Sequence, residues 1–181
     1  MRQFDRPVAT TDPYGLLAPV PGFTLTSEQL VDGGTTPEGQ VHEGAGGGNV
    51  SPQLSWSGAP EGTRAYIVTC FDPDAPTVCG FWHWILAGIP AGTTSLPAGA
   101  GGEGDTGLLP EGAFHLANDF DDHAYGGPMP PKGDRAHRYV FAVHALDAEL
   151  DLDSTDRAAY ASFTTGDHTL ARALLTVTHR R

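Results

Sequence analysis

The chain contains few positively charged residues. It carries 10 lysine and arginine residues against 22 aspartate and glutamate residues, Lys132 is the single lysine, and the formal net charge is −12. A chain this acidic repels nucleic acid and anionic membrane surfaces at long range. We therefore expect no nucleic-acid partner, and any anion that the protein binds must be held by local hydrogen-bond donors.

Cysteine is also rare. The 181 residues contain two, Cys70 and Cys79, too few for a disulfide scaffold. Cys70 lies in the apolar run YIVTCF and is expected in the core as a reduced thiol. A bridge between the two remains an open alternative.

Long apolar runs are absent. No stretch approaches the ~18 apolar residues of a membrane span, and the N-terminal segment MRQFDRPVATTDPYG has no apolar signal region. We therefore expect no stable membrane insertion and a cytoplasmic location. The length predicts one domain over 21–181. Residues 1–20 are polar with three prolines, so we expect an extended N-terminal arm without secondary structure.

What the chain does have is short apolar and β-branched runs separated by glycine and proline, a pattern typical of a mostly β protein. The predicted strands cover 23–27, 54–56, 64–71, 82–89, 112–116, 137–146 and 174–179. Helix is expected only late, over 156–163 with a cap at Ser154 and Thr155 and a stop at Gly166, and again over about 167–173. The glycine-rich stretch 91–112 is expected to be a long surface loop. This pattern predicts a β-sandwich or Greek-key sheet with peripheral helices.

Three short segments place polar and ionisable groups beside aromatic or rigid ones. They are DPDAP at 72–76, FWHW at 81–84 and YGGPMPPKGDRAHRY at 125–139. Together they supply the inventory of a small preformed pocket with a few convergent polar groups. No activated nucleophile accompanies them, since Ser51 and Ser57 lack a G-x-S-x-G context. The segments therefore favour a binding site over a catalytic centre.

Asp72 follows a predicted strand and is held extended by the proline after it. It can point into a cleft at that corner, or it can cap local N–H groups in a turn; the sequence leaves both open. His83 lies in an aromatic strand, where alternation predicts that it points to the face opposite Trp82 and Trp84. A lone histidine on a strand is more often a satisfied core residue than a ligand.

His137 changes that balance, because it opens a strongly predicted strand directly after a proline and glycine loop. An aspartate beside two histidines would fix one imidazole tautomer and raise its pKa. The resulting cation, with loop N–H groups, can accept phosphate or carboxylate. The same three residues, Asp72, His83 and His137, could alternatively hold zinc or iron, although no compact metal motif is present.

These motifs, in this order, resemble the phosphatidylethanolamine-binding protein family, and NVSPQLSW at 49–56 resembles its bacterial Raf kinase inhibitor-like branch. The resemblance implies a Greek-key β-sandwich, with a large antiparallel sheet packed on a smaller one and short peripheral helices. It also implies a pocket for an anion, phosphate or phospholipid headgroup. The implied ligand-binding residues are Asp72, Pro76, His83, Pro131, His137 and Tyr139, supported by Trp82, Tyr125, Gly127, Pro128 and Arg138.

Arg138 alternates with the pocket residues and could brace the proline loop through a carboxylate such as Asp119 or Asp122.

The function that we expect is a non-catalytic binding module, possessing no cofactor, whose affinity for anions rises as its histidines protonate. An inhibitor of a kinase or protease is the alternative, and it requires an exposed apolar patch, for example near 91–112. A homodimer is compatible with the size and the apolar strands.

Overall fold

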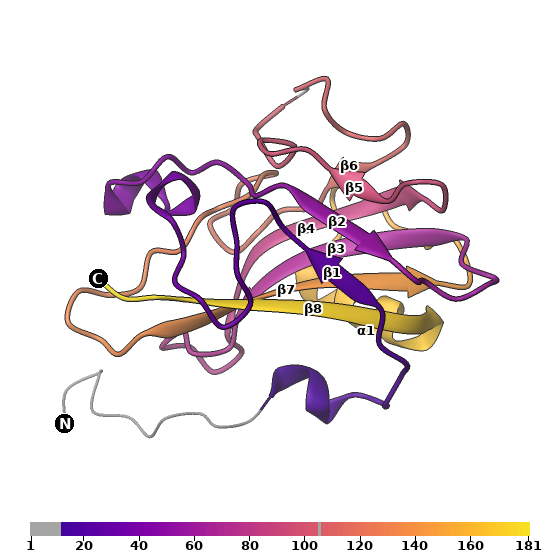
Figure 1. Cartoon of the computed structure of the whole chain (residues 1–181), viewed down its shortest axis with the longest axis horizontal. Helices are drawn as coiled ribbons and strands as arrows, with labels where there is room; N and C mark the ends of the chain where they lie inside the picture. The colour runs from indigo at the N-terminus through magenta and orange to yellow at the C-terminus, as the bar shows by residue number, and fades with distance from the viewer. Residues whose placement is uncertain (1–11, 105) are drawn as a thin grey trace.

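The computed structural model describes residues 12–104 and 106–181. Two antiparallel sheets make up most of the molecule (Figure 1). The larger sheet has the strand order β6-β4-β3-β7-β8 and the smaller one β1-β2-β5. The strands are β1 (Thr24–Thr26), β2 (Leu54–Ser57), β3 (Ala65–Asp72), β4 (Phe81–Pro90), β5 (Ser95–Leu96), β6 (Phe114–His115), β7 (His137–Leu146) and β8 (Thr169–His179). The helices are the 3-10 turns η1 (Pro13–Leu16), η2 (Glu38–Gln40) and η3 (Glu43–Ala45), and the α-helix α1 (Ala158–His168).

The larger sheet is apolar on both faces because both faces are covered. One face packs on the smaller sheet, and Trp84 and Tyr139 meet Leu54 and Leu96 in that core. The other face is covered by α1, whose Ala161 packs there with neighbouring strands. In Figure 1 the smaller sheet lies in front of the larger sheet and α1 lies behind β7 and β8. The predicted fold class, a two-sheet Greek-key sandwich with peripheral helices, is confirmed.

Strand β7 shows why the alternation of residues in the sequence predicted this strand correctly. Its alternate residues Tyr139, Phe141 and Val143 enter the core between the sheets, whereas Val140 and Ala142 face the opposite side. The strand is hydrogen-bonded to β3 on one side and to β8 on the other, so it is an interior strand, as its two apolar faces predicted. The predicted loop over 91–112 contains the short strand β5; Asp105 lies outside the described residues.

The prediction of two late helices was wrong. The chain forms one helix, which begins after Arg157 and continues through Gly166 to His168. Its buried residues Ala158, Ala161 and Thr165 lie one turn or two apart and pack on the sheet, which outweighs the roughly 1 kcal/mol cost of an interior glycine. Residues 169–173 pair with β7 instead of forming a helix, because sheet pairing overrides the helical propensity of alanine, leucine and arginine.

The N-terminal arm also departs from expectation within the described residues; residues 1–11 lie outside them. Residues 13–16 form η1, capped by Asp12. Tyr14 is buried with Val140 and Ala142 on the helix-covered face of the larger sheet. Its hydroxyl lies 3.2 Å from Thr69 Oγ1, and the Arg172 guanidinium stacks 5.0 Å from its ring centre. This end of the arm is therefore docked on the domain by one aromatic anchor.

Both cysteines are free thiols, with Cys70 buried as expected and Cys79 exposed. None of the helices in the described ranges is both long and apolar enough to cross a membrane.

Replacing Tyr14 with alanine tests the aromatic anchor. We expect Tyr14→Ala to lower the free energy of unfolding by about 2–4 kcal/mol, because it removes a buried ring and the contact with Thr69. Urea denaturation measures the change. Tyr160→Ala is the control: Tyr160 is 51% exposed on α1, so its removal should cost under about 0.5 kcal/mol. Equal effects of the two substitutions would contradict the anchoring role.

Candidate functional site

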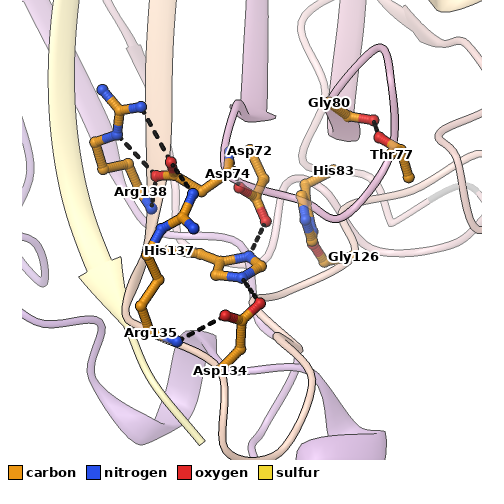
Figure 2. Close-up of polar contacts among 10 residues, drawn as sticks. All are labelled: Asp72, Asp74, Thr77, Gly80, His83, Gly126, Asp134, Arg135, His137 and Arg138. Carbon is orange, nitrogen blue, oxygen red and sulfur yellow. Dashed lines mark hydrogen bonds and ion pairs between the residues drawn. The ribbon is translucent and has the colours of Figure 1, made fainter. Parts of the chain in front are cut away.

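His137, the first residue of β7, is clamped between two carboxylates. Its Nδ1 lies 2.7 Å from Asp72 Oδ2 and its Nε2 lies 3.0 Å from Asp134 Oδ2 (Figure 2). All three side chains are almost completely buried. Burial by itself would lower the pKa of His137, but the hydrogen bonds and charges of Asp72 and then Asp134 outweigh it, so the pKa is raised. The ring is thus stabilised as an imidazolium that donates to both carboxylates.

Asp72 stands at the end of β3 and serves both roles that the sequence left open. Its Oδ1 accepts the N–H of Asp74 at 2.7 Å, which is the turn contact, while its Oδ2 accepts from His137. The proline after Asp72 fixes the corner at which this happens. The turn-capping interpretation and the pocket interpretation therefore describe the same carboxylate.

Asp74 is the carboxylate that holds Arg138, in place of the predicted Asp119 or Asp122. Arg138 donates to it from its backbone N–H at 3.0 Å and from Nε at 2.8 Å, and Arg135 Nη2 donates at 3.1 Å. Burial works against the charge of Asp74, but the hydrogen bonds from Arg138 and Arg135 outweigh it, so its pKa is lowered. This ion cluster braces the loop before β7 against the DPDAP corner (Figure 2).

His83 owes its position to a β-bulge. Trp82 pairs with Phe71 and Trp84 pairs with Cys70, so His83 is the extra residue opposite no residue of β3. The bulge overturns the predicted alternation: Trp84 lies in the core between the sheets, whereas Trp82 packs on the helix-covered face. The ring of His83 lies on the same side as Tyr139, 5.0 Å away between ring centres.

The hydrogen bond of His83 fixes its tautomer. Its Nδ1 lies 2.7 Å from the carbonyl oxygen of Gly126, and because a carbonyl only accepts, Nδ1 carries the proton. Burial lowers the pKa of His83 to about 4, against the opposing charge of Asp72. The ring is therefore neutral near pH 7, and Nε2 carries a lone pair. The sequence predicted that anion affinity rises as the histidines protonate. Because His83 is neutral near pH 7, this prediction now applies to His137 alone.

A cavity of about 240 Å³ opens between these groups. Its lining residues are Asp72, Ala75, Pro76, Thr77, Phe81, His83, Phe120, Met129, Pro131, His137 and Tyr139. The structure thus brings all six predicted ligand-binding residues to one cavity, from three strands and two loops. Their role in binding a ligand remains a prediction.

The hydroxyl of Tyr139 is the unusual polar group of this cavity. It is buried and has no hydrogen-bond partner among the described residues. Burial raises its pKa well above the usual range, with the charge of Asp72 acting in the same direction, so it stays a neutral donor at any ordinary pH. A buried donor without a partner costs free energy; seven other side-chain atoms of the described residues are in the same state, and Tyr139 is the one among them that lines this cavity.

The predicted supporting residues lie outside the cavity wall. Tyr125 donates its hydroxyl to the Gln40 carbonyl at 2.8 Å, and Gly127 donates its N–H to Asn49 Oδ1 at 2.7 Å. The carbonyl of Pro128 accepts the N–H of His42 at 3.2 Å. A side chain at Gly127 would collide with the backbone of 40–42. The glycine therefore permits close approach to the protein's own backbone rather than to a ligand.

Several residues of the site were not predicted from the sequence. Asp134 lies three residues before His137 in the quoted motif, a spacing that could have indicated the second carboxylate. Phe81 belongs to the FWHW segment and also lines the cavity. Phe120 comes from a distant loop and packs edge-on against Phe81, with ring centres 4.7 Å apart; nothing local in the sequence indicated it.

The metal alternative finds no support in this geometry. Within 12–104 and 106–181, no group of three or more histidine, cysteine or acidic side chains is arranged to hold a metal ion. Each ring nitrogen of His137 instead faces a carboxylate.

The structure is a two-sheet β protein with a polar-edged cavity at the ends of three strands of the larger sheet, and the comparisons with known proteins identify its class. The family model described as phosphatidylethanolamine-binding protein matches residues 26–180. The chain belongs to the phosphatidylethanolamine-binding protein family.

Two Escherichia coli relatives are similar over most of their length. UPF0098 protein YbhB is 44% identical over 157 residues, which cover 84% of this chain and 96% of YbhB. UPF0098 protein YbcL is 43% identical, over 85% of both chains. The crystal structure of YbcL, described as a new member of the mammalian family, matches with a TM-score of 0.84 at 42% identity, covering 88% of this chain and 98% of that one.

The clamp around His137 makes stability depend on pH. Its pKa is raised above the ordinary value of 6.5, so its contribution is complete below pH 6.5 and disappears as the pH rises through the raised value. We expect Asp134→Asn to lower the free energy of unfolding by about 1.5–3 kcal/mol at pH 6 and by much less at pH 9. Urea denaturation at the two pH values measures this.

The matched control for the clamp is Asp147→Asn. Asp147 lies 2.8 Å from His168, and their side chains are 51% and 40% exposed, so solvent screens the pair and its removal should change stability little. An equal loss for Asp134→Asn at pH 6 and pH 9 would contradict the clamp.

Proposed function

We propose that this protein is a binding protein for a small ligand that carries an anionic group, phosphate above all, and that the ligand occupies the cavity between Asp72, His83, His137 and Tyr139. The observation that carries the proposal is the Tyr139 hydroxyl, a buried donor without a partner on the wall of that cavity. An acceptor oxygen of the ligand would satisfy it. The family's name supports the same chemistry.

The carboxylate of Asp72 does not favour a cationic ligand instead. Both of its oxygens already accept hydrogen bonds, from Asp74 N–H and from His137. The His137 imidazolium offsets the charge of one of the two carboxylates that clamp it, and the second, Asp134, does not line the cavity. The walls around it are apolar, from Phe81, Phe120 and Met129 among others, which strengthens each hydrogen bond made inside.

Other expectations from the sequence stay predictions. An inhibitor of a kinase or protease would need an exposed apolar patch, for which the 91–112 loop is one expected place; in the described part of that stretch Leu108 is the one large apolar side chain that is exposed. The cytoplasmic location, the homodimer and a regulatory role likewise remain untested. The cavity offers no activated nucleophile, and binding without turnover is the function that we propose.

Replacing Tyr139 with phenylalanine tests the proposal. Phosphate and phosphoethanolamine are titrated into the protein at pH 6, and the ring signals of His83 and His137 are followed by NMR. We expect both histidines to shift, and we expect Tyr139→Phe to weaken binding by about tenfold or more, because it removes a hydrogen bond to a charged group.

Tyr125→Phe is the matched control, since Tyr125 is equally buried and its hydroxyl donates to Gln40 outside the cavity. It should leave the affinity unchanged. Saturable binding of ethanolamine with no response to phosphate would overturn the anionic assignment, and no response to any of the three ligands would overturn the pocket.

A further inference from the structure

Arg172, a residue of β8, is a half-buried cation on the helix-covered face of the larger sheet. Its guanidinium lies 5.0 Å from the ring centre of Tyr14, and its Nε donates to His144 Nδ1 at 3.3 Å. Among the described residues its two terminal nitrogens form no hydrogen bond, and no carboxylate pairs with it. The guanidinium is therefore held in place while its outer N–H groups stay available to a ligand.

A groove of about 300 Å³ opens beside this guanidinium, between α1 and the segment that follows η1. Apart from Arg172, its wall is largely apolar. The apolar side chains of the wall are Leu17, Ala18, Val20 and Phe163. Leu17 is 41% exposed and Phe163 is 72% exposed, so the groove presents uncovered apolar surface next to an unpaired positive charge.

A smaller void adjoins the groove beneath α1. Arg172 and Gly166 are among the residues that line both, and the void measures about 20 Å³, which is room for one water molecule or one ligand oxygen. Thr165 of α1 lies in its wall. This side chain is 4% exposed, and its hydroxyl has no hydrogen-bond partner within the described part of the chain. A second polar group thus lacks a partner next to the groove.

A carboxylate joined to an apolar chain matches these groups. The planar guanidinium offers paired N–H groups in the geometry that a carboxylate accepts, and the apolar wall would cover the chain. One guanidinium balances one negative charge, whereas a phosphomonoester dianion would be left under-compensated. We infer that this groove is a second ligand site, which takes a small monocarboxylate with an apolar chain.

This site is separate from the cavity around Tyr139. Tyr139 lies in the core between the two sheets, whereas Tyr14, on which Arg172 stacks, lies on the opposite face of the larger sheet. The inference therefore does not depend on the proposed function, and each can fail without the other.

The carboxylates near Arg172 do not take the place of the ligand. Asp167 lies in the groove wall and Asp12 caps η1, but both are exposed, so solvent screens their charges. Asp12 also accepts the N–H of Tyr14 at 3.0 Å. Burial lowers the pKa of Arg172, and Tyr14 and Asp12 act in the opposite direction; the guanidinium stays charged at any ordinary pH.

Octanoate is the probe, titrated into the intact protein at pH 7 by calorimetry and by NMR. We expect saturable binding that shifts the Arg172 Nε–H signal and leaves the ring signals of His83 and His137 unchanged. Octanol and octylamine keep the chain and lose the carboxylate, and they should bind about tenfold more weakly or worse. Acetate keeps the carboxylate and loses the chain, and it should be weakened by a similar factor.

Arg172→Gln removes the charge at the head of the ligand. We expect it to weaken octanoate binding by about tenfold or more. The control is Arg157→Gln: Arg157 directly precedes α1 and its side chain is 81% exposed, so its removal should leave the affinity unchanged.

Phe163→Ser shortens the apolar wall. It should weaken octanoate binding by about threefold or more and leave acetate binding unchanged. Tyr160→Ser is its control, because Tyr160 lies about one turn away on α1, is 51% exposed and does not line the groove. Phe163 is a surface residue, so this pair decides the question even where Arg172→Gln fails to fold.

Four outcomes would overturn the inference, and they differ in meaning. Equal affinities for octanoate, octanol and octylamine would remove the carboxylate from the assignment. Octanoate binding that shifts His83 and His137 and is lost in Tyr139→Phe would place the ligand in the other cavity. An N-acetylated dipeptide with a free leucine carboxylate that binds more tightly than octanoate would assign the groove to a peptide terminus. No octanoate binding would refute the site, and a dimer that Phe163→Ser dissociates would then assign the groove to a second copy of the chain.

Discussion

The site depends on one interaction, the burial of the His137 imidazole between Asp72 and Asp134. It joins the end of β3 to the start of β7 and the loop directly before β7, which lie 65 residues further along the chain in the case of His137. Either carboxylate without the ring would be an uncompensated buried charge, and the ring without them would lose its proton. Each of the three residues therefore requires the other two. Two of them, Asp72 and His137, line the cavity, so the clamp fixes the shape of that wall.

The β-bulge in β4 is the second constraint. A regular strand would place His83 and the two tryptophans by simple alternation, but the inserted residue turns Trp82 to the helix-covered face and leaves His83 beside the cavity. Gly126 then fixes the tautomer of the ring by accepting the Nδ1 proton. The bulge thus turns a strand residue toward the cavity, and re-aiming a side chain is a common effect of bulges.

Most strands could be predicted from the sequence, because alternation such as that in 137–146 is a local signal. The residues that gather at the cavity could be predicted only through the resemblance of the ordered motifs to the family. The bulge, the pairing of Arg138 with Asp74 and the contribution of Phe120 could not, because each depends on contacts between segments that are distant in the chain. The prediction that the helix stops at Gly166 was wrong for a similar reason. Packing on the sheet, rather than local helix propensity, decides where α1 ends.

A protein with a net charge of −12 gains nothing from its overall field when it binds an anion, and the polar groups of the cavity largely neutralise one another. Recognition must then rest on a few oriented hydrogen bonds in an apolar surrounding, where each is strong and each mismatch is costly. A site of the proposed kind would discriminate by the positions of its hydrogen-bond donors and acceptors more than by total charge. Its affinity should therefore be modest and weakly dependent on salt, because screening acts on exposed charges far more than on buried hydrogen bonds, and its selectivity between similar anions should be high.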